Sequence, residues 1–121
     1  MAGPPGNRAI LHWLAQNLDN PFRGWDGAEH IPAAAAKKAA NQYRKTRSQL
    51  MKLASEPCED AQTQALEAVA AYTQTFNKMR FIETEERDEI YMALRDILDA
   101  LPGETLQKDA LLEQFEQLRD F

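Results

Sequence analysis

Apolar side chains recur at helical spacing between residues 85 and 101, and this pattern constrains the fold more than any other stretch of the sequence. Residues three or four positions apart lie on one face of an α-helix, and the other face of this segment is densely charged. Thr84 is the predicted N-cap, because its hydroxyl can accept a free backbone N–H, and Pro102-Gly103 is expected to end the helix. The apolar face consists of Ile90, Leu94, Ile97, Leu98 and Leu101.

A second helix is predicted directly before this one, from about Cys58 to Arg80. The two helices are joined by the acidic turn Phe81–Thr84. A connection this short favours antiparallel neighbours, so we expect a central helical hairpin. The inward stripe of the earlier helix consists of Ala65, Val69, Tyr72, Phe76 and Met79.

Three further helices are expected around the hairpin. One covers residues 7–18 and carries an apolar face. Another begins at Pro32, which suits a first helical turn, and ends before Pro57, which disfavours helix in the preceding residue. An additional C-terminal helix is predicted for residues 104–121. The inward positions of these three helices are Ile10, Leu14 and Leu18; Ala39, Tyr43, Thr46, Leu50 and Leu53; and Leu111, Phe115 and Leu118.

The remaining segments are connections. Residues 1–6 contain two prolines and two glycines and are expected to be a flexible lead-in. The loop at residues 19–31 carries Phe22 and Trp25, so we expect it to fold back onto the helices. Every periodic segment has helical spacing, and none shows the alternation of a strand. The sequence therefore predicts an all-α, single-domain bundle of about five helices over residues 1–121, with mostly antiparallel neighbours.

Composition and targeting signals narrow the class of protein. No run of about 18 consecutive apolar residues is present, so no membrane-spanning helix is expected. Residues 1–7 lack a charged region followed by an apolar one, which argues against a secretory signal. Cys58 is the only cysteine and cannot form an internal disulfide. A lone thiol fits a reducing compartment, so a cytoplasmic location is predicted.

Charge is divided unevenly along the chain, which has a net charge of −5. Residues 1–55 carry eight basic and three acidic side chains, whereas residues 56–121 carry six basic and sixteen acidic ones. Such asymmetry can steer a partner, or the two halves can pair their charges internally. The basic residues of one helix could attract a phosphate backbone, but a pI near 5.0 and the expected burial of Tyr43 argue against nucleic-acid binding. These basic residues are Lys37, Lys38, Arg44, Lys45, Arg47 and Lys52.

No constellation for catalysis or for metal binding is apparent. His12 and His30 are the only histidines, and structural zinc requires more ligands at suitable spacing, so we expect packing or capping roles for both. Cys58 has no evident base or oxyanion site, and nearby acids oppose thiolate formation, so an inert or partly buried thiol is predicted. We therefore expect a protein that is not an enzyme and that uses no cofactor or metal.

Acidic side chains cluster at the turn before the most periodic helix and in its first turns. They lack the alternating ligands and the glycine of a calcium loop, and we expect them to be solvated rather than held in a dry pocket for acid catalysis. A charged helix face is one interpretation. The other is a docking surface for a basic partner, with Phe81 or Tyr91 as an apolar centre. The residues predicted to bind such a partner are Glu83, Glu85, Glu86, Asp88, Glu89 and Tyr91.

The order of the elements and three short motifs resemble a known family. The motifs are Arg47-Ser48, Glu83-Thr84 and Ala93-Leu94-Arg95-Asp96, within a likeness that extends from Arg8 to Leu98. In these features the chain is similar to the small helical immunity proteins that neutralise NAD(P)-degrading toxins of type VI secretion. It differs in a slightly longer spacing between the last two motifs and in the additional C-terminal helix.

That resemblance implies a bacterial, cytoplasmic protein without activity of its own, which binds a cognate toxin and blocks access to its nucleotide site. It implies no metal and no cofactor. Two alternatives stay open beside it. One is another helical inhibitor or adaptor, for example a phage-encoded protein acting on a host complex. The other is a small nucleic-acid-binding regulator that uses the helix at residues 37–52. The sequence specifies no oligomeric state.

Overall fold

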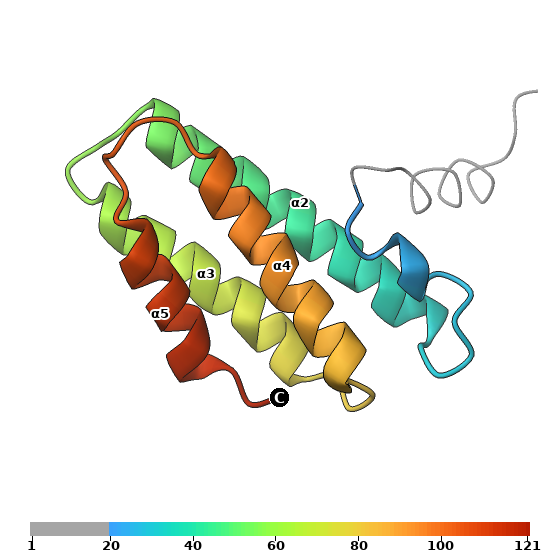
Figure 1. Ribbon diagram of the computed structural model, residues 1–121. Coiled ribbons are helices and arrows are strands. Elements are labelled where there is room, and N and C mark those ends of the chain that lie inside the picture. The colour runs from blue at the N-terminus through green and yellow to red at the C-terminus, as the bar shows by residue number, and fades with distance from the viewer. Residues whose placement is uncertain (1–19) are drawn as a thin grey trace, which may run out of the picture.

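The computed structural model describes residues 20–121, which form four α-helices and one short 3₁₀-helix and contain no β-strand (Figure 1). The all-α prediction is therefore confirmed for this part of the chain. The helix predicted at residues 7–18 and the lead-in at residues 1–6 lie outside the described residues. The elements are η1 (Arg23–Trp25), α2 (Ala33–Ser55), α3 (Ala61–Asn77), α4 (Thr84–Ala100) and α5 (Lys108–Leu118).

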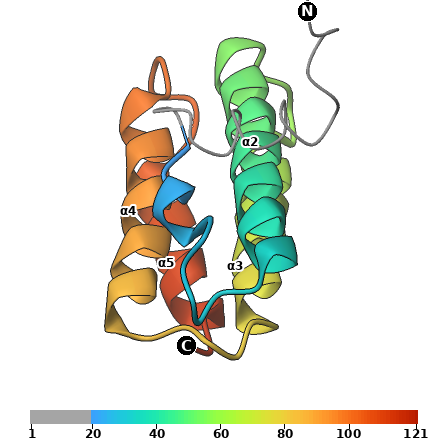
Figure 2. The same ribbon diagram turned by 90° about the vertical axis from the view of Figure 1, so that its right-hand side faces the viewer.

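Helices that follow one another along the chain run antiparallel, but two adjacent pairs in the bundle are parallel (Figures 1 and 2). α2 and α4 lie side by side and begin at the same end of the bundle. α3 and α5 also run parallel: Gln62 near the start of α3 bonds the backbone of Gln107 just before α5, and Asn77 at the end of α3 bonds the backbone of Leu118. The prediction of mostly antiparallel neighbours therefore holds for α2–α3 and α4–α5, and is wrong for the other two pairs.

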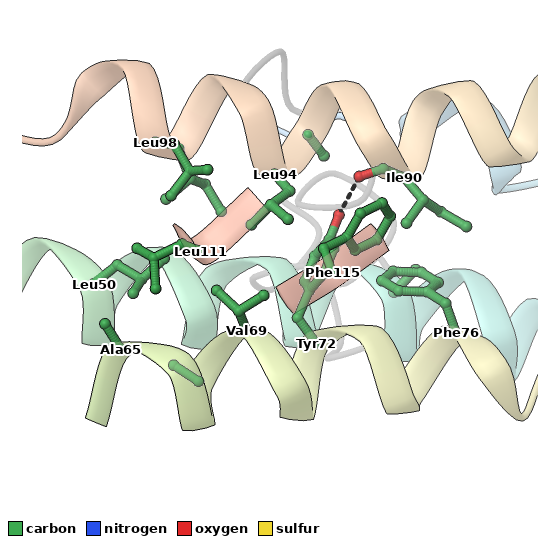
Figure 3. Close-up of a cluster of buried hydrophobic side chains, with 14 of the residues drawn as sticks. Leu50, Ala65, Val69, Tyr72, Phe76, Ile90, Leu94, Leu98, Leu111 and Phe115 are labelled. Atoms are coloured by element: carbon green, nitrogen blue, oxygen red, sulfur yellow. Dashed lines mark hydrogen bonds between the residues drawn. The ribbon is translucent and has the colours of Figure 1, made fainter. Parts of the chain in front are cut away.

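The central hairpin predicted for the helices now labelled α3 and α4 has the expected antiparallel direction, but these two helices are not each other's closest neighbours. α3 and α4 are antiparallel and joined by a short turn, yet the backbones closest to α4 are those of α2 and α5. Small buried side chains on α3, such as Ala65 and Ala68, permit its close approach to α2. Larger side chains fill the space between α3 and α4, where the Tyr72 hydroxyl donates a hydrogen bond of 2.6 Å to the backbone carbonyl of Ile90 (Figure 3).

One hydrophobic core extends through the bundle and receives side chains from every described helix (Figure 3). Its central residues lie on the predicted inward faces and are at most 2% exposed, which confirms the helical phase read from the sequence. Four predicted inward residues are only half-buried: Tyr43, Leu53, Met79 and Leu118. The central residues include Val69, Phe76, Leu94, Ile97 and Phe115.

The loop before α2 folds back onto the helices, as predicted. Phe22 and Trp25 are each 1% exposed, and their ring centroids lie 5.3 and 6.0 Å from that of Phe76 on α3. The Asn20 side chain accepts a 2.9 Å hydrogen bond from the backbone N–H of Phe22, which shapes the turn into η1. Gly27, with a φ of 84°, then supplies a left-handed residue after η1. The loop thus lies between α2 and α4 on one face of the bundle (Figure 2).

α4 is capped by Glu83 rather than by Thr84, which is its first helical residue. The Glu83 side chain accepts a hydrogen bond from the backbone N–H of Glu86, and the Glu86 side chain accepts one from the backbone N–H of Glu83. This reciprocal capping box satisfies backbone N–H groups that the start of a helix leaves unpaired. At the other end Leu101 is the C-cap, and Gly103 has the expected left-handed conformation, with a φ of 68°.

α3 and α5 are both shorter than predicted. α3 does not fill residues 58–80 but stops at Asn77, whose side-chain amide binds the C-terminal segment instead. α5 begins at Lys108, four residues later than predicted. The Gln62 amide bonds the N–H and the C=O of Gln107 at 2.8 and 3.4 Å, which keeps the backbone before α5 out of helical geometry.

Candidate functional site

The six residues predicted to bind a partner lie at three different depths. All six belong to the turn before α4 or to its first turns, so their differences arise from the direction in which each side chain leaves the helix. Only the exposed members are available to a partner without rearrangement. The exposed members are Glu83, Glu85 and Asp88, the half-buried ones are Glu89 and Tyr91, and the buried one is Glu86.

Glu86 is 4% exposed, so the expectation that it is solvated is wrong. Its carboxylate accepts the backbone N–H of Glu83 at 3.2 Å and lies 3.3 Å from Nε2 of His30. Glu86 stands four residues before Ile90, on the buried face of α4, and as the third helical residue of a capping box its side chain turns back toward the start of the helix. Glu86 therefore holds the amino end of α4 and the loop together, with the half-exposed His30 on its solvent side.

Glu89 joins the loop to α4. Its Oε1 accepts a 3.3 Å hydrogen bond from the indole N–H of Trp25, whose ring is otherwise buried. Burial raises the pKa of the Glu89 carboxyl and the nearby charges of Glu86 and Glu85 raise it further, while the bond from Trp25 lowers it. Glu89 thus satisfies a donor that would cost free energy if left unpaired, and it is not a free charge at the surface.

The two predicted aromatic anchors also belong to the body of the protein. The Tyr91 ring centroid is 6.3 Å from that of Phe115 on α5, and its hydroxyl accepts a 3.0 Å hydrogen bond from the guanidinium of Arg95. Phe81 is half-buried, with its ring centroid 5.6 Å from that of Trp25. Neither ring supplies an exposed apolar centre.

α4 nevertheless has a continuous exposed face. This face extends further toward the C-terminal end of the helix than the predicted docking surface does. Met92 lies at its centre and is 52% exposed, the one large hydrophobic side chain in residues 20–121 that is exposed. Glu85, Asp88 and Asp96 form no ion pair with a described residue, whereas Asp99 lies 3.7 Å from Arg95. The helical spacing that predicts the buried face of α4 also defines this opposite face. The residues predicted to bind a partner end at Tyr91, so they do not include the part of this face from Met92 to Asp99. We call it the acidic stripe: Glu85, Asp88, Met92, Asp96 and Asp99.

α2 carries the opposite charge on its outward face. It contains no acidic residue, and its exposed lysines form no ion pair with a described residue. A shallow depression of about 310 Å³ lies on this surface around Ala34, Asn41 and Gln42. Tyr43 is half-buried, with its ring centroid 6.4 Å from that of Phe22, so it is not an open stacking platform. We call this surface the basic face: Lys37, Lys38, Asn41, Lys45 and Lys52, of which the first four line the depression.

A groove of about 480 Å³ runs between α2 and α3. Lys45 and Lys52 lie on its α2 side, and Glu56 and Glu67 also line it. Since both signs of charge line the groove, it favours neither an anionic nor a cationic ligand.

Cys58 also lines this groove and is exposed, so of the two expectations, an inert thiol or a partly buried one, the partly buried thiol is wrong. Its S–H donates to a carboxylate oxygen of Asp60 at 3.3 Å. Hydrogen bonds from Gln64 and from Cys58 hold the pKa of the Asp60 carboxyl below its usual value.

Residues 20–121 contain no group of three or more His, Cys, Asp or Glu side chains arranged to hold a metal ion. No helix in this range is both long enough and apolar enough to cross a membrane. His12 lies outside the described residues. Comparisons with protein-family models, curated proteins and solved structures found no match. The function is therefore inferred from the surfaces of the molecule.

Proposed function

We propose that this protein is a protein-binding inhibitor, an immunity protein that neutralises a cognate bacterial toxin in the cytoplasm by covering the toxin's nucleotide site. The acidic stripe of α4 is the observation that supports this function. It combines three carboxylates that form no ion pair within residues 20–121 with an exposed apolar side chain, on a helix whose other face is fixed in the core. A surface held in place in this way loses little conformational freedom on binding.

The chemistry of the stripe suits a pocket that binds nucleotides. A pocket that holds phosphate groups is basic, so carboxylates that approach its rim meet the opposite charge. Met92 is unbranched and adaptable, and can fill an apolar recess of irregular shape. Charges at the rim of an interface mainly accelerate association, whereas a buried apolar group slows dissociation. Met92 thus takes the role predicted from the sequence for Phe81 and Tyr91, which pack against Trp25 and Phe115.

The motifs shared with the immunity proteins lie on α2 and α4. Glu83-Thr84 forms the start of α4, and Arg47-Ser48 is exposed on α2. In the third motif Ala93 and Leu94 are buried, whereas Arg95-Asp96 is exposed beside Met92. The resemblance therefore includes one member of the acidic stripe, in addition to residues that build the helix itself.

An immunity gene is expected to lie beside the gene of its toxin. The protein encoded by the neighbouring gene is therefore the candidate toxin with which the proposal is tested. The candidate toxin is produced in cells together with the wild-type protein, a stripe variant, or a control with the same change of charge at other exposed acids. The wild type and the control should protect the cells, and the stripe variant should not. Equal protection by all three proteins would contradict docking through α4, and no protection by the wild type would contradict immunity. The stripe variant is Glu85→Lys/Asp88→Lys/Asp96→Lys, and the control is Glu67→Lys/Glu104→Lys/Glu113→Lys.

A further inference from the structure

The basic face of α2 and the acidic stripe of α4 are opposite in charge and similar in spacing. Lys38 and Lys45 lie seven residues apart on α2, and Asp88 and Asp96 lie eight residues apart on α4. At a rise of ~1.5 Å per residue, these separations are about 10.5 and 12 Å. α2 has no acidic residue, and the one exposed cation of α4, Arg95, is already engaged by Asp99 and by the hydroxyl of Tyr91.

The two surfaces also match in shape. The basic face has a depression of about 310 Å³ around Asn41, and the acidic stripe has one projecting apolar side chain, Met92. Lys38 and Lys45 stand three and four residues from Asn41, on either side of it. Carboxylates stand four residues from Met92 on either side. When Met92 enters the depression, each flanking carboxylate therefore comes opposite a lysine.

We propose that the acidic stripe of one copy of this protein docks on the basic face of a second copy, with Met92 seated in the depression around Asn41. This inference does not rest on the proposed function, although it uses the same side of α4. The two surfaces lie on different helices, so the contact is heterologous, and each copy keeps one unoccupied face for a further copy. Further copies can therefore add to the assembly until it closes into a ring or its free faces are blocked.

Two neutralised variants test this pairing. In one the lysines of the basic face become glutamine, and in the other the carboxylates of the acidic stripe become amides. All six positions are exposed, so circular dichroism should show that both variants keep the helical content of the wild type. The basic-face variant is Lys38→Gln/Lys45→Gln/Lys52→Gln, the stripe variant is Glu85→Gln/Asp88→Asn/Asp96→Asn, and a control is Glu67→Gln/Glu104→Gln/Glu113→Gln.

Sedimentation velocity at low salt gives the readout. The wild type and the control should form larger species as concentration rises, and either variant alone should associate at least about tenfold more weakly, since the two ion pairs beside Met92 are lost. An equimolar mixture of the two variants should form a species of two copies and nothing larger, because only one complementary pair of faces remains. Met92→Ala should also weaken association, without changing its dependence on salt.

Three results would overturn the inference: a wild-type protein that stays monomeric at every concentration, variants that associate as the wild type does, or a mixture of variants that stays monomeric. The proposed function is tested separately by the basic-face variant. That variant keeps the acidic stripe, so it should protect cells from the toxin even though it no longer self-associates.

Discussion

Replacing Phe76 by alanine should remove a large part of the stability of the fold. The Phe76 side chain is 0% exposed, and its ring centroid lies 4.9 Å from that of Tyr72 and 5.3 Å from that of Phe22. Losing the burial of a phenylalanine costs about 1.5–3 kcal/mol. A residual cavity of roughly 80 Å³ adds about 2 kcal/mol at ~24 cal/mol per Å³.

The cavity is expected to stay open because its walls are held by other contacts. Tyr72 is bonded to the carbonyl of Ile90, and Trp25 is bonded to Glu89, so neither ring can move in without breaking a hydrogen bond. We therefore expect Phe76→Ala to lower the free energy of unfolding by about 3–5 kcal/mol.

The assay is urea titration followed by far-ultraviolet circular dichroism, with Met92→Ala as the control. Met92 is 52% exposed, so its truncation should change the free energy of unfolding by less than about 0.5 kcal/mol. A loss below about 1 kcal/mol for Phe76→Ala would show that the ring is not packed in this way, and that the reasoning about the core is wrong.

Three further predictions concern the hydrogen bonds and the charges. Tyr72→Phe should cost about 1 kcal/mol in urea titration at pH 7. Burial raises the pKa of Tyr72 well above its ordinary value, so the wild type should lose stability above about pH 10, where the unfolded chain ionises, more steeply than this variant. Burial likewise raises the pKa of Glu89, so the folded state binds its proton more tightly and the wild type should gain stability as pH falls from neutral toward about 4.3. Glu89→Gln keeps an acceptor for Trp25 and should lack this gain. In fluorescence anisotropy near physiological salt the protein should bind neither DNA nor RNA, and submicromolar binding that falls steeply with salt would instead support the nucleic-acid regulator.

Local patterns predicted most of the elements but not their neighbours. The period in residues 84–101 gave the correct buried face of α4, because a helix with one apolar side must turn that side toward the core. The sequence also predicts the burial of Phe22 and Trp25, because large rings rarely remain in solvent, and both are buried. Which helices lie side by side depends on the sizes of facing side chains and on bonds such as Gln62 to Gln107, which links α3 to α5. No period along one helix contains that information.

The candidate site was predictable only in part, for a similar reason. A count of acids near the turn cannot tell a solvated carboxylate from one that completes a capping box, as Glu86 does. It also cannot reveal that Glu89 accepts a hydrogen bond from Trp25, 64 residues earlier. Met92 could have been found from the sequence, since it lies opposite the apolar face at helical spacing. The density of charge near the turn does not identify Met92, whereas the period of the outward face does.

The rate constants of toxin binding test the docking surface most directly. Surface plasmon resonance would compare the wild type, the variant Glu85→Lys/Asp88→Lys/Asp96→Lys, and Met92→Ala. The lysine variant should associate with the toxin at least about tenfold more slowly, and with the opposite dependence on salt. Met92→Ala should dissociate faster while its association rate stays close to that of the wild type. If both rate constants of the lysine variant equal those of the wild type at low salt, the acidic stripe is only a solvated helix face, and the proposed docking surface is wrong.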